Sequence, residues 1–86
     1  EARFFTFVSK EEDAVPVKEL KLPDGARCVC YYRDGRFEVA DGGTKLQKGD
    51  EVVILSHSRN MASLQERFQP RQEQGGDPAG KQESGR

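Results

Sequence analysis

The chain has 86 residues, 34% of them hydrophobic and 34% charged, and its 14 basic and 15 acidic residues leave a net charge of −1. This length fits one small domain, and no run approaches the roughly 20 apolar residues that a membrane-spanning helix needs. Proteins that bind nucleic acid usually carry a basic excess on one face, so the near-neutral charge argues against such a partner. We therefore expect a single soluble domain that does not insert into a membrane.

The chain begins with a predicted strand at residues 3–9, where aromatic and β-favouring residues occupy both alternating faces. A polar run at residues 10–13 then breaks the pattern. Val17 and Leu20 follow, and their spacing predicts a single turn of helix. Residues 23–25 read Pro-Asp-Gly, which predicts a tight turn before the next strand.

Two further strands are predicted at residues 26–32 and 36–40. The residues between them include Asp-Gly, the pair preferred in two-residue hairpin loops. In the second of these strands Phe37 and Val39 alternate with residues that point the other way. We therefore expect that strand to be half-exposed and to lie near an edge of the sheet.

A last strand is predicted at residues 51–56, where both alternating faces are apolar, as in a central and buried strand. The loop at residues 41–44 precedes it, and Leu46 is predicted to plug the core. A turn at residues 48–50 then delivers the chain into the middle of the sheet.

A final helix is predicted from a three-then-four spacing that places three apolar side chains on one face: Met61, Leu64 and Phe68. Ser58 or Asn60 is expected to cap its start, and Pro70 to end it. Residues 70–86 contain one alanine and no larger aliphatic or aromatic residue, so they cannot offset their own ordering entropy. We expect a disordered tail there.

These elements predict an α+β fold at residues 1–69: a small, mostly antiparallel four-stranded sheet with a short helical turn and a C-terminal helix. A thin sheet with one covering helix cannot easily hide aromatic side chains on both faces. For this reason Phe4, Phe5 and Phe7 are predicted to lie in a dimer interface. The alternative is that the two-faced pattern marks only a central strand.

No catalytic or metal site is predicted. Cys28 and Cys30 lack the second ligand pair that zinc needs and are too close for a disulfide in extended backbone, so we expect reduced core thiols. His57, the single histidine, lies between two serines with no acidic residue nearby in sequence. We therefore expect no enzyme activity.

Several charged residues are expected to have structural roles and not to bind a ligand. The acidic run at residues 11–13 is interpreted as a solvated turn in preference to a calcium loop. Asp34 and Asp50 are expected to accept backbone hydrogen bonds in turns. Arg33 is expected to be an exposed arginine at a strand end, in preference to a ligand for a phosphate or a carboxylate.

An ordered set of turn and apolar residues precedes the last strand: Leu20, Leu22-Pro23, Gly25-Ala26, Arg33-Asp34-Gly35, Thr44, Leu46 and Gly49-Asp50. This set resembles the C-terminal domain family of potassium-transport regulators, known as TrkA-C or RCK-C, and the likeness covers about Phe5 to Phe68. The resemblance implies a regulatory module, usually a dimer, that is not an enzyme. Its implied partner is a membrane-embedded potassium channel, potassium-uptake system or cation/proton antiporter, in the same chain or a separate one.

The implied location is the cytoplasmic side of the cell membrane. Since the chain starts at Glu1 without a methionine, we expect it to be a piece of a longer protein. Complete regulators of this family carry a nucleotide-binding Rossmann domain, whereas this chain has no G-x-G-x-x-G after a strand. NAD or ATP is therefore not expected here.

Some relatives in this family bind cyclic di-AMP in the groove of the dimer, and the resemblance carries that role to Glu19, Leu20, Lys21, Leu22, Arg27 and Cys28. Lys21 stands where those binders tend to have arginine, and Arg27 where they tend to have asparagine, which changes the hydrogen-bond pattern. We expect no cofactor, with cyclic di-AMP as the less favoured case. The alternative function is a ligand-free protein–protein interaction domain that acts by dimerisation or strand-edge pairing.

Overall fold

The computed structural model describes residues 1–69, and its elements follow the predicted order. Four strands, one α-helix and three short 3₁₀ helices are found in these residues: β1 (Ala2–Val8), 3₁₀ helices Glu11–Asp13 and Val17–Leu20, β2 (Ala26–Arg33), β3 (Arg36–Val39), β4 (Glu51–His57), 3₁₀ helix Ser58–Asn60 and α1 (Met61–Phe68). The α+β class is confirmed. The predicted tail at residues 70–86 and the role of Pro70 as a helix stop lie outside the described residues.

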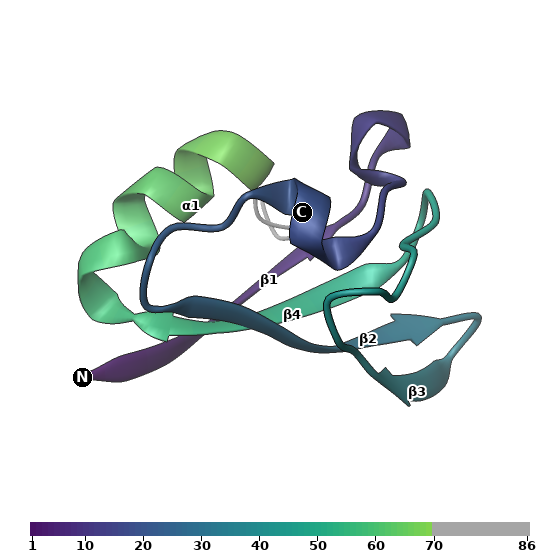
Figure 1. Cartoon of the computed structure of the whole chain (residues 1–86), viewed down its shortest axis with the longest axis horizontal. Coiled ribbons are helices and arrows are strands. Elements are labelled where there is room, and N and C mark those ends of the chain that lie inside the picture. Colours follow the sequence, from purple (N-terminus) through teal and green to yellow (C-terminus); the bar gives the residue numbers. More distant parts are fainter. Residues whose placement is uncertain (70–86) are drawn as a thin grey trace, which may run out of the picture.

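The four strands form one sheet in the order β1-β4-β2-β3, and every neighbouring pair is antiparallel (Figure 1). The central position predicted for the last strand is confirmed, since Ile54 of β4 pairs with Phe5 of β1 on one side and with Cys28 of β2 on the other. The first strand of the chain therefore lies beside the last one.

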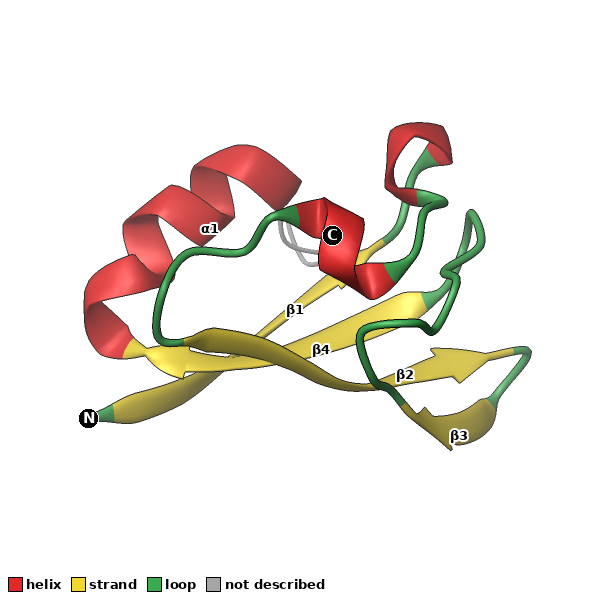
Figure 2. Cartoon of the chain, viewed as in Figure 1, coloured by secondary structure: helices red, strands yellow, loops and turns green. Residues whose placement is uncertain are grey.

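One face of the sheet is covered by α1 and by the two 3₁₀ helices that follow β1 (Figure 2). Alternate residues of β1, β2 and β4 point into this core and meet Leu64 and Phe68 of α1. Leu46 is fully buried, so its predicted role as a plug is confirmed. The core consists of Phe5, Phe7, Val17, Leu20, Cys28, Tyr31, Leu46, Val52, Ile54, Leu64 and Phe68.

No element of residues 1–69 covers the opposite face of the sheet (Figure 1). We call it the open face, and its apolar residues are Phe4, Val8, Cys30, Tyr32, Phe37, Val39, Val53 and Leu55. Here two predictions were wrong in part. Val53 and Leu55 of the central strand are only half-buried, and all four residues of β3 are exposed where half-exposure was expected. Within residues 1–69, helices therefore pack against only one face of the sheet.

An irregularity in β2 decides which of its side chains reach the core. Cys28 pairs with Ile54 but Cys30 pairs with Val53, so the register shifts by one residue between the two cysteines. Such a bulge sends the residues after it to the opposite faces. Tyr31 consequently enters the core, whereas Cys30 belongs to the open face.

The hairpin between β2 and β3 has the predicted two-residue loop. Asp34 and Gly35 both have positive φ, 53° and 76°, the backbone that type I′ turns require at their two central positions. Arg33 pairs with Arg36 across this loop. The Asp-Gly signal in the sequence therefore marked the turn correctly.

The start of α1 differs from the prediction, because neither Ser58 nor Asn60 caps it with a side chain. The short 3₁₀ helix before α1 is capped by His57, whose Nδ1 accepts a hydrogen bond from the backbone N–H of Arg59 at 3.0 Å. The amide nitrogen of Asn60 instead donates to the carbonyl oxygen of Asp24 at 2.9 Å. Asn60 thus ties the helix start to the turn before β2.

Candidate functional site

The six residues implied as ligand contacts do not form one exposed cluster. Leu20 and Cys28 are each 4% exposed and belong to the core, which takes their side chains out of reach of a ligand. Glu19, Lys21 and Arg27 are exposed, and Leu22 is half-buried. A binding role for the exposed residues stays a prediction.

The stretch that contains Leu20 and Lys21 is held by α1. Arg67 donates hydrogen bonds from Nη1 to the carbonyl oxygen of Lys21, at 3.0 Å, and from Nη2 to that of Leu20, at 2.5 Å. Lys21 has φ 53°, an uncommon left-handed backbone for a residue other than glycine. The guanidinium of Arg67 also lies 4.6 Å from the ring centroid of Phe68. Nothing in the sequence pattern singled out Arg67 for this contact.

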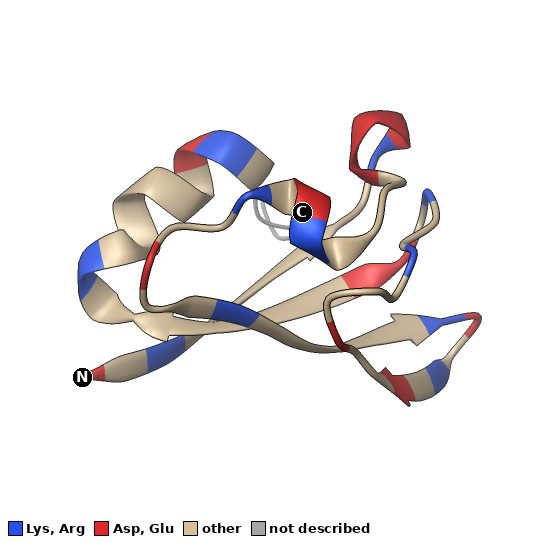
Figure 3. Ribbon diagram, in the orientation of Figure 1, with Lys and Arg blue, Asp and Glu red and all other residues tan. Residues whose placement is uncertain are grey.

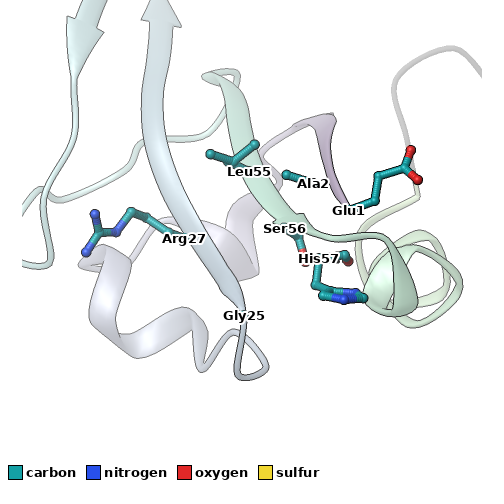
Figure 4. Close-up of a pocket in the computed structure, with 7 residues that line it drawn as sticks. All are labelled: Glu1, Ala2, Gly25, Arg27, Leu55, Ser56 and His57. Atoms are coloured by element: carbon teal, nitrogen blue, oxygen red, sulfur yellow. Dashed lines mark hydrogen bonds between the residues drawn. The ribbon is translucent and has the colours of Figure 1, made fainter.

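Arg27, one of the predicted ligand residues, borders two surface hollows. One hollow of about 460 Å³ is lined by Arg27, by residues from the ends of β4 and β1, and by the turn before β2: Glu1, Ala2, Gly25, Leu55, Ser56 and His57 (Figure 4). Another, also about 460 Å³, lies between Arg27, Val39 and Asp41. Arg27 is therefore the cation that both hollows share.

The ring of His57 caps the 3₁₀ helix that follows β4. Its Nδ1 is engaged as the acceptor for Arg59, which requires the neutral imidazole at that nitrogen. Partial burial, followed by the positive charges of the amino terminus and Arg59, lowers the pKa of His57. These features fit the structural role expected for this histidine.

Arg33 forms an ion pair with Asp50, and the expectation of an exposed strand-end arginine that binds no carboxylate was wrong. Its Nε and Nη2 donate to Oδ1 and Oδ2 of Asp50 at 2.8 and 2.7 Å, and Nη2 also donates to the carbonyl oxygen of Lys45 at 3.2 Å. Asp50 is 1% exposed and accepts the backbone N–H of Gln47 at 2.8 Å, as predicted for a turn aspartate. Arg33 therefore holds a carboxylate of its own chain.

The pKa of Asp50 reflects this pair. Burial by itself would raise it, but hydrogen bonds from Arg33 and from the backbone N–H of Gln47, together with the charge of Arg33, lower the pKa below its ordinary value of 3.8. Asp50 thus carries a charge in the folded protein at neutral pH. The pair joins the β2–β3 hairpin to the turn that leads into β4.

The two cysteines are free and lie on opposite faces of the sheet. Cys28 belongs to the core as predicted, but the same prediction was wrong for Cys30, which is half-buried on the open face because of the bulge. Burial, and then the proximity of Cys30, raise the pKa of the Cys28 thiol to about 11. The acidic run after β1 forms the 3₁₀ helix Glu11–Asp13 (Figure 3). Glu11 and Glu12 are exposed, as expected for a solvated turn, but Asp13 is buried and accepts the backbone N–H of Lys10 at 2.9 Å. Within residues 1–69 no group of three or more His, Cys, Asp or Glu side chains is arranged to hold a metal ion.

The three phenylalanines predicted for a dimer interface separate into two groups. Phe5 and Phe7 are 5% and 0% exposed in the core of the chain itself, where Phe7 stacks on Phe68 with ring centroids 4.3 Å apart. This part of the prediction needs correction, because buried rings offer no surface to a partner. Phe4 is 69% exposed on the open face, and its use in an interface stays a prediction.

None of the helices in residues 1–69 is long and apolar enough to cross a membrane. The exposed large hydrophobic side chains of residues 1–69 lie on the open face, where Phe4, Tyr32, Phe37 and Val39 are 69%, 41%, 56% and 74% exposed. Tyr32 and Phe37 touch there edge to face, with centroids 5.7 Å apart. We take this surface, together with Arg27, as the candidate functional site.

Comparison with known proteins gives one family and two kinds of relative. The family model of the TrkA-C domain matches residues 13–69. The Trk system potassium uptake protein TrkA homolog of Archaeoglobus fulgidus is 33% identical over 58 residues, which are 67% of this chain and 13% of that protein. The K(+)/H(+) antiporters NhaP2 of Shewanella baltica and Shewanella oneidensis are each 30% identical over 53 residues, 62% of this chain and 9% of the antiporter. The chain thus spans about a tenth of the length of these relatives.

Proposed function

The chain belongs to the TrkA-C domain family, and from that membership we propose that it is a regulatory domain of a potassium or other cation transport protein. In this proposal it lies on the cytoplasmic side of the membrane as part of a larger protein, with a membrane-embedded transporter or channel as its partner. The domain works as a homodimer that can adopt more than one arrangement. A ligand that binds one arrangement more tightly than another shifts the population of dimers toward the arrangement that it binds. The proposed role is regulatory and not catalytic.

The observation that carries the proposal is the family match over residues 13–69, together with relatives named for two different transport systems. One relative is named for potassium uptake and the other for the exchange of K(+) against H(+). A small domain that is similar to part of each of these proteins is better explained as a regulator of transport than as a part of the path that the ions follow. The uncovered apolar face of the sheet supports a partner in the working state.

The first test is a chimera of the Shewanella oneidensis antiporter in which residues 1–69 replace the region that they match. We expect the chimera to show K(+)/H(+) antiport in everted membrane vesicles with a dependence on K(+) or pH that the antiporter lacking this region does not have. Antiport is followed as dequenching of a pH-sensitive dye after K(+) is added.

The matched control carries Phe7→Asp, which puts a charge at a fully buried position and should unfold the domain. This variant is expected to behave like the antiporter without the region. A folded, unmutated chimera that is indistinguishable from that deletion would contradict the regulatory role.

For the ligand, we propose that cyclic di-AMP is not the effector. Leu20 and Cys28 are buried, and Lys21 and Arg27 alter the hydrogen-bond pattern implied by the family resemblance. Titration with cyclic di-AMP should therefore leave the melting temperature unchanged. A rise in melting temperature that Arg27→Ala removes, while the exposed Arg36→Ala keeps it, would refute this expectation and make the domain a cyclic dinucleotide sensor.

A second candidate function is a ligand-free interaction domain, and β3 is the observation that favours it. This edge strand, Arg36–Val39, is exposed at all four positions, and an exposed edge can pair with a strand of another chain. A thermal-shift screen of nucleotides, cyclic dinucleotides and cations discriminates between the two roles. Stabilisation by one compound favours the sensor, and its absence across the screen favours the interaction domain.

A further inference from the structure

The helix α1 depends on its neighbours for its stability. Its 8 residues are fewer than the roughly 12–15 that an isolated helix needs to be even marginally stable in water. The buried side chains of Leu64 and Phe68 anchor its middle and its end, but no side chain caps its first turn. The start of α1 is therefore held by the short 3₁₀ helix Ser58–Asn60, which leads directly into it.

His57 lies at the joint between the sheet and this helical segment. Its backbone N–H donates to the carbonyl oxygen of Gly25 at 2.9 Å, and the backbone N–H of Ser58 donates to that of Glu1 at 2.8 Å. The ring nitrogen Nδ1 of His57 accepts the backbone N–H of Arg59 at 3.0 Å and so caps the 3₁₀ helix. Segments at the ends of β1, β2 and β4 thus meet the helical segment around one histidine.

The chemistry of this cap differs from that of the usual caps. Serine, threonine, aspartate and asparagine cap helices with oxygen atoms, which accept a hydrogen bond throughout the neutral range of pH. An imidazole nitrogen accepts a hydrogen bond only while it carries no proton, because both nitrogens of a protonated histidine are donors. Protonation of His57 therefore removes the acceptor and also places a positive charge at the start of a helix, where the backbone dipoles disfavour it.

The charged groups around the ring do not compensate for such a charge. Arg59, on the 3₁₀ helix, repels it. Glu1 and Arg27 line the hollow beside His57, but Figure 4 shows the carboxylate of Glu1 pointing away from the ring and the guanidinium of Arg27 on the far side of the hollow. Asp24, in the turn before β2, contacts the helix start through its carbonyl oxygen. Burial, the amino terminus and Arg59 accordingly lower the pKa of His57.

We propose that His57 is a pH-sensitive fastening of α1, whose protonation loosens the start of the helix from the sheet. The inference goes beyond the proposed function, because it names a residue at which a change in pH acts on the domain itself. The other end of α1 carries the effect further, since Arg67 holds the carbonyl oxygens of Leu20 and Lys21. A loosened α1 therefore releases the stretch that leads to β2.

The composition of the chain gives this fastening a clear pH range. His57 is the single histidine among the 86 residues, and histidine is the side chain whose ordinary pKa lies between about pH 5 and about pH 8. Because the pKa of His57 is lowered in the folded state, the unfolded chain binds the proton more readily. The stabilisation by His57 is therefore complete above the ordinary pKa of 6.5 and is lost as the pH falls through the folded-state pKa.

The first test is urea denaturation of the full chain at about pH 7.5 and about pH 5, at one fixed protein concentration. Acidification should raise the unfolding equilibrium constant of the unmutated chain by roughly 3- to 30-fold more than that of His57→Asn, whose amide oxygen can cap but cannot titrate. His57→Ala cannot cap, so its unfolding equilibrium constant should already be raised by a similar factor at about pH 7.5. The amino terminus and the carboxylates are common to all three chains and cancel.

Nuclear magnetic resonance of the unmutated chain adds a measurement that needs no substitution. The ring protons of His57 should titrate with a pKa below 6.5. The amide proton of Arg59 should exchange faster, relative to its intrinsic rate at each pH, once the ring is protonated. The amide resonance of Lys21 should shift with the same midpoint, and Arg67→Met should abolish that shift while leaving the response of Arg59.

The outcomes separate the steps of the proposal. A loss of stability in acid that His57→Asn removes, together with faster exchange at Arg59, supports it. Equal pH dependence in the unmutated chain and in His57→Asn, a His57 pKa at or above 6.5, or full stability of His57→Ala at about pH 7.5 overturns it. A response at Arg59 without one at Lys21 overturns the release of the stretch before β2. The antiporter chimera judges the proposed function independently of all these results.

Discussion

Replacing Arg33 by methionine is expected to cost about 3–5 kcal/mol of unfolding free energy at neutral pH, because it leaves the buried Asp50 carboxylate without its partner. The same substitution should also reverse the way in which Asp50 makes the unfolding free energy depend on pH. In the unmutated chain, the pKa of Asp50 is lowered in the folded state, so its stabilisation is present above the ordinary value of 3.8 and is lost as the pH falls below it.

Without Arg33, burial becomes the dominant influence and raises the pKa of Asp50 above that of the unfolded chain. The folded state then takes up a proton more readily than the unfolded state, and the destabilisation is relieved as the pH falls toward 3.8. The difference in unfolding free energy between variant and parent should therefore shrink from neutral pH to about pH 3.5.

Urea denaturation at several pH values measures this difference, and groups common to both proteins cancel in it. Arg36→Met is the matched control, because Arg36 is paired with Arg33 across the hairpin but is exposed and is expected to change stability by less than about 0.5 kcal/mol. If the difference for Arg33→Met were independent of pH, the ion pair would not be what holds Asp50 in its charged form.

Truncating Phe7 to alanine should destabilise the domain by about 3–5 kcal/mol, a large part of the total stability of a chain this small. Phe7 is fully buried, it stacks on Phe68 at 4.3 Å, and its ring lies 6.1 Å from that of Phe5. The substitution leaves a cavity between β1 and α1 that neither element can easily fill. Chemical denaturation monitored by circular dichroism measures the loss.

Phe4→Ala is the control, since Phe4 is a neighbouring phenylalanine of the same strand that faces away from the core. It should change the stability of the monomer by less than about 0.5 kcal/mol. A Phe7→Ala/Phe68→Ala double-mutant cycle should also give a coupling of about 0.5–1.5 kcal/mol for the stacked pair. Equal losses for Phe4→Ala and Phe7→Ala would mean that the faces of β1 are assigned incorrectly.

The elements of this fold were readable from the sequence because each has a local signal. Alternation and β-branched residues marked the strands, Asp34-Gly35 marked the hairpin, and the spacing of Leu64 and Phe68 marked the helix. The isolated Leu46 between polar loops could be identified as a core residue for the same reason. Each of these features depends on residues that are close in the chain.

The features that sequence reasoning missed depend on tertiary packing. The bulge between Cys28 and Cys30 leaves no mark in composition, yet it decides that Tyr31 is buried and Tyr32 is exposed. The pair Arg33–Asp50 joins residues 17 apart in the chain, and only the placement of the hairpin beside the turn brings them together.

The same limit applies to the candidate site. Phe4 and Phe5 are identical in type, and their opposite fates follow from which side of β1 receives α1. Arg67 could not be linked to Leu20 because the contact depends on how α1 lies over the sheet. The sequence therefore predicted which strand carries exposed aromatic side chains, but not which face of that strand is exposed.

The neighbourhood of β1 and β4 has a consequence for how the protein is made. β1 occupies residues 2–8, and the strand that completes its hydrogen bonding ends only at His57. A nascent chain emerging from the ribosome therefore holds Phe5 and Phe7 without their partners until nearly all of residues 1–69 have been synthesised. Contacts of such long sequence separation form slowly, so the domain should fold in one late step, after residues 1–69 have all been synthesised.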